Sequence, residues 1–204
     1  MNSSLRTIAG ALLALAAICG PASATSSVDL SNPAFAPIGE ATSIPIGAAE
    51  FCKSHRADCG LNTGDQLETL TEARWQALVA VNDAVNMAVA PVTDADLYKV
   101  NEFWTYPAGQ GDCEDYALEK RRELIALGWS PASLMMTVVR QANGEGHAVL
   151  MVRTDRGDLV LDNQDGRVLV WKDTAYEFVK RQSQNDPRKW VGISDTRVIL
   201  ASAQ

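Results

Sequence analysis

Residues 134–171 decide the fold, and they read LMMTVVRQANGEGHAVLMVRTDRGDLVLDNQDGRVLVW. Four runs of apolar and β-branched residues lie in this stretch, at residues 134–141, 147–153, 158–162 and 168–171. Turn-forming residues separate the runs, namely Asn143-Gly144, Asp155-Arg156-Gly157 and Asp165-Gly166. Short β-rich runs joined by tight turns predict an antiparallel meander.

Two helices are expected upstream of this meander. In the first, the sequence from Thr69 to Glu72 has the form of a capping box, and apolar residues follow at helical spacing until Pro91. Asn82 and Asn86 on this helix are expected to hydrogen-bond loops, because an amide has no acid–base role near neutral pH.

The second helix is predicted to run from about Cys113 to Leu127, with Gly128 ending it. Four residues are expected on its inner side, namely Tyr116, Ala117, Leu124 and Leu127. Helices first and strands afterwards predict an α+β domain in which the Cys113 helix packs on the sheet.

The N-terminal residues predict export. Residues 1–24 are expected to form a secretory signal peptide, because the apolar run from Ile8 to Cys19 precedes the small residues Ala22 and Ala24. A retained N-terminal anchor is the alternative. Residues 25–50 are expected to form an extended or partly disordered N-terminal arm, and residues 51–204 a single folded domain. The protein is therefore expected to be periplasmic or secreted.

The net charge of −7 argues against nucleic acid as a partner, since such binding draws on clustered Lys and Arg. Export would leave Cys52, Cys59 and Cys113, an odd number for an oxidising compartment. A Cys52–Cys59 disulfide is favoured because it closes a short polar loop. A zinc site that uses both cysteines and His55 is the alternative.

Cys113 is then the unpaired thiol, and it stands at the first turn of its predicted helix, directly after a glycine turn. The helix dipole and the free N–H groups at that position favour a thiolate and can receive a developing oxyanion. A lone cysteine is more often a small buried apolar residue. The charged neighbours of Cys113 favour the nucleophile.

A thiol nucleophile needs a base and a residue that orients the base. The chain has two histidines, and His55 lies in the predicted disulfide loop, which leaves His147. The predicted hairpin of residues 147–162 returns Asp162 to the end at which His147 begins, where it can accept the second imidazole N–H. The alternatives are a surface His147 and an Asp162 that only forms a turn.

Asp112, Glu114 and Asp115 surround the thiol in the sequence, and carboxylates there would raise its pKa unless a cation offsets them. Oxygen ligands gathered in a turn suit Ca²⁺. The same carboxylates would also complement the helix N-terminus without any metal. The residues alone slightly favour this capping role over calcium.

Four motifs, in order along the chain, resemble the bacterial transglutaminase-like cysteine proteinases, the family that includes the LapG-type periplasmic proteases. The motifs are Phe51-Cys52 to Asp58-Cys59, Gly111-Asp112-Cys113-Glu114-Asp115-Tyr116-Ala117, Gly146-His147-Ala148-Val149-Leu150 and Leu161-Asp162-Asn163. The resemblance implies a papain-like α+β fold and a thiol peptidase mechanism. It puts Cys113, His147 and Asp162 in the nucleophile, base and orienting positions.

The resemblance also implies a calcium site formed by Asp112, Glu114 and Asp115. LapG-type members cut large surface adhesins at paired alanines, and an inner-membrane receptor that senses a cyclic dinucleotide holds them back, which controls biofilm release. Resolution of the acyl-thioester by an amine would instead give a transglutaminase or amidase. Outside the enzymes, the alternative is a binding module without turnover.

Overall fold

The computed structural model describes residues 28–197, and the predicted signal peptide of residues 1–24 lies outside the described residues. The helical elements are α1 Ile46–Ser54, α2 Glu72–Ala88, α3 Asp94–Leu97, α4 Cys113–Ala126 and the short 3₁₀ turns η1 Pro131–Ser133 and η2 Trp171–Asp173. The strands are β1 Ile38–Thr42, β2 Ala90–Pro91, β3 Gln110–Gly111, β4 Leu134–Arg140, β5 Gly146–Thr154, β6 Gly157–Leu161, β7 Leu169–Val170, β8 Glu177–Gln182 and β9 Trp190–Ile193. The architecture is α+β, as the sequence predicts.

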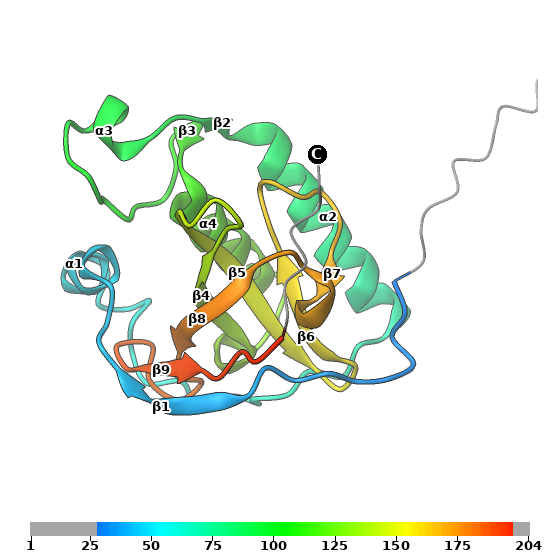
Figure 1. The fold of residues 1–204 in the computed structure, drawn as a ribbon. Helices are drawn as coiled ribbons and strands as arrows, with labels where there is room; N and C mark the ends of the chain where they lie inside the picture. The colour runs from blue at the N-terminus through cyan, green and yellow to red at the C-terminus, as the bar shows by residue number, and fades with distance from the viewer. Residues whose placement is uncertain (1–27, 198–204) are drawn as a thin grey trace, which may run out of the picture.

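The main sheet has seven strands in the order β1-β9-β8-β4-β5-β6-β7 (Figure 1). Strands β4 to β7 are the predicted meander, and each pair is antiparallel. Strands β8 and β9 were not predicted. Strand β8 pairs with the other edge of β4, and β9 links β8 to β1. The predicted meander thus forms four of the seven strands of the sheet.

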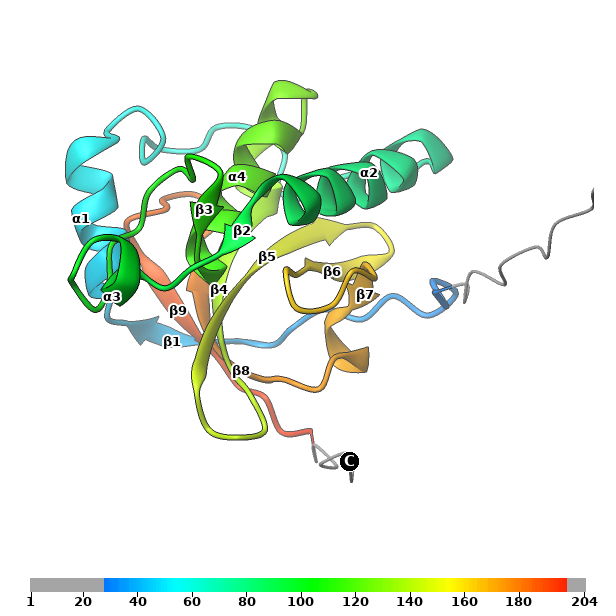
Figure 2. The same ribbon diagram turned by 90° about the horizontal axis from the view of Figure 1, so that it is seen from above.

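Helix α4 packs on β4 and β5, and α2 packs on α4. Figure 2 shows both helices on the same side of the meander. The N-cap of α2 is Thr71, whose hydroxyl accepts from the N–H of Arg74 at 3.2 Å, so Thr69 is not the cap that the sequence suggested. Glu72 is the first helical residue and cannot serve as the reciprocal partner of a capping box.

Helix α4 ends as predicted, because Gly128 takes a left-handed φ of +83° that favours glycine. Three of the four residues expected on its inner side are buried, whereas Leu127 is 60% exposed. The predicted burial of Leu127 is wrong, because this residue is the C-cap and lies past the last turn of the helix. Lys120 and Arg121 are buried, and Arg121 Nε donates to the carbonyl of Leu134 at 3.2 Å.

The predicted N-terminal arm is extended over part of its length. Within it, β1 pairs antiparallel with β9. Helix α1 crosses the predicted domain boundary between residues 50 and 51. Cys52 and Cys59 form a disulfide with their Cα atoms 5.5 Å apart. The zinc alternative is wrong because each sulfur is bonded to the other.

The core lies between the meander and the two helices, with Leu78, Leu124 and Val149 each fully buried. Across residues 28–197, no helix is both long enough and apolar enough to cross a membrane.

Candidate active site

Cys113 is the first residue of α4 and the one free cysteine in the described part of the chain. The turn before it is tight, because a side chain at Gly111 would meet the carboxylate of Asp115 at 2.6 Å. This close approach is what the two glycines of the turn predict, since only glycine leaves room for it. The thiol therefore lies at the N-terminus of a 14-residue helix, next to free backbone N–H groups.

His147 and Asp162 come together as the sequence predicts. His147 is the second residue of β5, and Asp162 directly follows β6, the strand that pairs antiparallel with β5. His147 Nε2 lies 2.8 Å from Asp162 Oδ1, and each residue is 3% exposed. A buried imidazole and a buried carboxylate thus satisfy each other at the end of the hairpin.

Asp162 is held by more than the histidine. Its Oδ1 also accepts from the N–H of Gln164 at 3.1 Å, and its Oδ2 accepts from the Tyr176 hydroxyl at 2.5 Å. Asn86 of α2 donates to the backbone carbonyl of Asp162 at 2.8 Å, which confirms the loop-bonding role predicted for this amide. Asn82 likewise donates to Gly166 at 2.9 Å.

These hydrogen bonds set the charge of the pair. Burial alone would raise the pKa of Asp162, but the bonds from His147, Tyr176 and Gln164 outweigh it and hold the pKa below its usual value. An ionised carboxylate can only accept, so Nε2 of His147 carries the ring proton. The lone pair is then on Nδ1, which has the side-chain nitrogen of Gln164 at 3.4 Å.

The thiol lies beside this pair. The N–H of Ala148, the residue after His147, hydrogen-bonds the sulfur of Cys113. The thiol itself donates to Glu114 Oε2 at 3.1 Å, and within residues 28–197 no hydrogen bond joins it to His147. Burial raises the pKa of Cys113, and Glu114 raises it further, so the thiol is protonated in this arrangement.

Three carboxylates form an acidic cluster in front of the thiol. One oxygen each from Asp94, Asp112 and Glu114 lie within 4.8 Å of one another. One oxygen of each carboxylate is bonded to the protein: Asp94 Oδ2 accepts from the N–H of Phe103, Asp112 Oδ2 from the N–H of Asp94, and Glu114 Oε2 from the thiol. The other oxygen of each, Asp94 Oδ1, Asp112 Oδ1 and Glu114 Oε1, is buried without a partner.

Asp115, predicted as a ligand with Asp112 and Glu114, is not one of the three. Its Oδ1 accepts from the N–H of Thr105 at 2.9 Å, and its Oδ2, like one oxygen of each cluster residue, is buried without a partner. Asp94 is the third member of the cluster. The parallel pairing of β2 with β3 brings residue 94 beside residue 112. That pairing involves two residues per strand and has no signal in the sequence.

The cluster is compatible with a cation. Asp112 is the N-cap residue of α4, yet its side chain makes no capping hydrogen bond. Burial raises the pKa of Asp94, raises that of Glu114 to about 9 and raises that of Asp115 to about 7. Buried oxygens of this kind need protons or a cation, and carboxylate oxygens are the ligands that Ca²⁺ takes in proteins.

The described residues match one family along most of their length. The model of the bacterial transglutaminase-like cysteine proteinase family (BTLCP) matches residues 38–198. The calcium-bound structure of Legionella pneumophila LapG is similar in fold at 20% identity and a TM-score of 0.50, covering 78% of this chain and 94% of that one. A second structure of the same protein is 21% identical at a TM-score of 0.50, covering 74% and 91%. No curated protein matches the chain.

The acidic cluster predicts how stability depends on pH when no cation is bound. A carboxylate with a raised pKa holds its proton more tightly in the folded chain, so the unfolding free energy falls as pH rises between the two pKa values. For Glu114 this window runs from 4.5 to about 9. Lys120 acts in the opposite sense above pH 7, because burial lowers its pKa from 10.5 to about 7.

We predict that Glu114→Gln in EDTA raises the unfolding free energy by about 2 kcal/mol at pH 8 and changes it much less at pH 5. Lys120 contributes equally to the unfolding free energy of the wild type and of the variant, so its contribution cancels in the difference. Glu123→Gln, an exposed change on the same helix, should follow the wild type at both pH values. Urea unfolding measures the difference, and an equal effect of Glu114→Gln at pH 5 and pH 8 would contradict the prediction.

Proposed function

The chain belongs to the bacterial transglutaminase-like cysteine proteinases, and from this premise we propose that Cys113 is the nucleophile, His147 its base and Asp162 the residue that orients the base. The observation that carries the proposal is the buried 2.8 Å contact between His147 and Asp162 beside the helix that begins at the free thiol. As a peptidase of this family, the protein acts on a protein substrate.

The proposed reaction begins with proton transfer from the Cys113 thiol to His147 Nδ1, the nitrogen with the lone pair. The thiolate attacks the carbonyl carbon of the scissile peptide bond, and the free N–H groups at the start of α4 would stabilise the oxyanion. His147 then gives its proton to the leaving amine as the carbon–nitrogen bond breaks. Water, deprotonated by His147, hydrolyses the thioester and frees the thiol.

Asp162 serves the imidazole throughout this sequence. Its charge stabilises the imidazolium that forms when His147 takes the thiol proton. Its hydrogen bond also fixes the ring so that Nδ1 faces the nucleophile. The low pKa that its hydrogen bonds give it keeps the carboxylate ionised for this role.

We further propose that Asp94, Asp112 and Glu114 hold Ca²⁺, with Asp115 beside them. Bound calcium would supply positive charge that offsets the carboxylates next to the thiol. The unpartnered oxygens of the cluster support this, as does the calcium-bound state of the Legionella protein. A Glu114 carboxylate that shares its charge with a cation is a weaker acceptor for the thiol proton, which leaves Cys113 available to His147.

We also propose that the protein works outside the cytoplasm, in the periplasm, after removal of residues 1–24. The Cys52–Cys59 disulfide supports an oxidising compartment. By its resemblance to LapG-type proteases, we propose a large surface adhesin as its substrate and an inner-membrane receptor as the partner that sequesters it, in the control of biofilm release.

The triad predicts a graded loss of peptidase activity. Cys113→Ala should leave a folded, inactive protein, and His147→Ala should lose nearly as much, since triad members act as a unit. Asp162→Asn should be milder than either. His55→Ala, which changes the other histidine, is the matched control and should stay active. Turnover of a quenched peptide library that includes paired-alanine sequences measures this; hydrolysis by Cys113→Ala would end the proposal.

The calcium site predicts that EGTA lowers both peptidase activity and melting temperature, because a ligand that binds only the folded chain stabilises it. Added Ca²⁺ should restore both, and Mg²⁺ should restore little, since its small octahedral shell suits these oxygens poorly. Asp94→Asn should blunt the response to Ca²⁺, whereas Asp96→Asn, an exposed change in the same short helix, should keep it. An unchanged melting curve and activity on chelation would show that the cluster holds no functional calcium.

A further inference from the structure

The proposed orienting carboxylate is itself held by a hydroxyl from outside the hairpin. Tyr176 donates to Asp162 Oδ2 at 2.5 Å, while His147 and Gln164 occupy Oδ1. The Tyr176 ring also lies 5.3 Å from the His147 ring, measured between centroids. The Tyr176 hydroxyl therefore decides how the carboxylate is turned toward the imidazole.

The Tyr176 side chain packs against the core and is half-buried. The residue lies in the loop between η2 and β8, outside any strand. A cavity of about 290 Å³ borders it, lined on the other sides by Asp162, Leu169 and Thr174 among others. A ring that faces a cavity on one side needs another restraint to hold its hydroxyl at hydrogen-bond distance.

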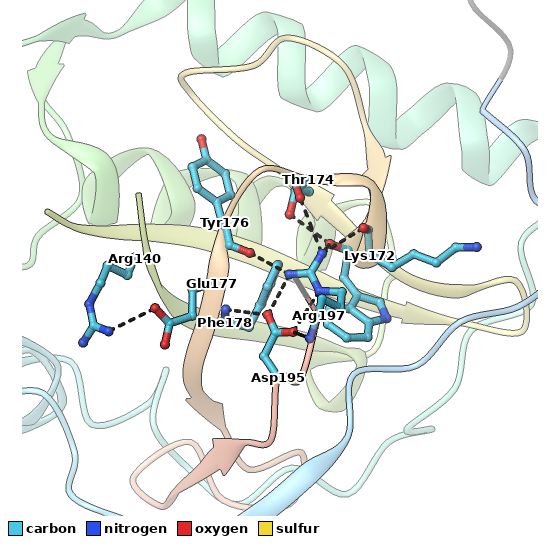
Figure 3. A network of polar contacts seen from close by, with 9 residues as sticks. Arg140, Lys172, Thr174, Tyr176, Glu177, Phe178, Asp195 and Arg197 are labelled. Carbon is cyan, nitrogen blue, oxygen red and sulfur yellow. Dashed lines mark hydrogen bonds and ion pairs between the residues drawn. The ribbon is translucent and has the colours of Figure 1, made fainter. Parts of the chain in front are cut away.

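That restraint comes from Arg197, near the C-terminal end of the described chain. Figure 3 shows its guanidinium directed into the loop, with the Tyr176 ring pointing away from it. The guanidinium donates to four backbone carbonyls, those of Tyr176 at 2.6 Å, Lys172 at 2.8 Å, Trp171 at 3.0 Å and Thr174 at 3.4 Å. It thereby ties both ends of residues 171–176 to one side chain.

Arg197 is in turn held by Asp195 and by the ring of Trp171. Asp195 accepts two of its N–H groups, at 2.9 and 2.7 Å, and also accepts the backbone N–H of Phe178 at 3.0 Å. The guanidinium lies over the ring of Trp171, 4.4 Å from its centroid. A lysine has neither the planar fork nor the stacking surface for this arrangement.

We propose that Arg197 and Tyr176 are positioning residues of the active site: Arg197 fixes the loop, and the Tyr176 hydroxyl fixes Asp162 and through it the His147 ring. This inference rests on the proposed triad. Each residue acts only through Asp162, without touching the substrate or the sulfur.

The test compares Tyr176→Phe, Arg197→Met and the double variant in the full chain with Ca²⁺ present. Each single change should lower kcat by roughly 10-fold to 100-fold, because small displacements of a catalytic group are costly, and should leave KM within about twofold. The kcat of the double variant should be no lower than that of the less active single variant, because both changes remove the same restraint.

The matched control is Arg140→Met. Arg140 pairs with Glu177, one residue after Tyr176, at 3.0 Å, and half of each side chain is exposed (Figure 3). This change removes an arginine contact from the same loop region without touching the carbonyls that Arg197 binds. It should leave kcat unchanged. Arg197→Lys, which keeps the charge, replaces Arg197→Met if the latter does not fold, with the same loss of kcat expected.

A second readout does not need activity. The chain has two histidines, so the ring ¹⁵N signals of His147 and His55 can be told apart by single substitutions. Tyr176→Phe should move the signals of His147 and leave those of His55 in place. If the wild type proves to have no peptidase activity, the proposed function fails while this measurement still tests the positioning contact.

Two results would overturn the inference. One is a Tyr176→Phe protein with wild-type kcat and unmoved His147 signals, which would make the hydroxyl dispensable. The other is a double variant whose loss equals the product of the two single losses, which would mean that Arg197 acts by a route that does not pass through Tyr176.

Discussion

The hydrogen bond between His147 and Asp162 is the interaction on which the rest of the site depends. Asp162 is 3% exposed, and a carboxylate that is removed from water must be compensated by donors or neutralised by a proton. Here three elements supply donors to the carboxylate: β5 through His147, the loop after β6 through Gln164 and the loop before β8 through Tyr176. Helix α2 holds the same residue by its backbone, because Asn86 donates to the carbonyl of Asp162. Burial of one charge thus ties together parts of the chain that are far apart in sequence.

The carboxylates of the acidic cluster are also removed from water, but they lack the donors that Asp162 has. Asp94, Asp112 and Glu114 each keep one buried oxygen without a donor. Their positions follow from the parallel pairing of β2 with β3 and from the tight turn before α4, and both features serve to present the thiol. The turn that positions the nucleophile therefore also gathers negative charge beside it, and a cation would offset that charge. This is the physical reason to link calcium to activity as well as to stability.

The sequence predicted the parts of the site that depend on local pattern. The meander of residues 134–171, the helix beginning at Cys113 and the return of Asp162 to His147 all follow from turn residues and strand spacing, and the structure confirms them. Asp94 and Tyr176 were missed because each reaches the site through a contact between distant segments. A two-residue parallel bridge places Asp94, and a loop tied by Arg197 places Tyr176. Neither leaves a periodic pattern in the sequence. The export signal and the adhesin substrate stay predictions.

The central claim is that His147 controls the ionisation of Cys113. The most direct measurement is the rate at which iodoacetamide alkylates Cys113 as a function of pH, with Ca²⁺ present, in the wild type and in His147→Ala. A thiolate paired with an imidazolium should give the wild type a plateau of reactivity well below the ordinary thiol pKa of about 8.5, and His147→Ala should lose it. Two identical curves that both rise only near the ordinary thiol pKa would contradict the account.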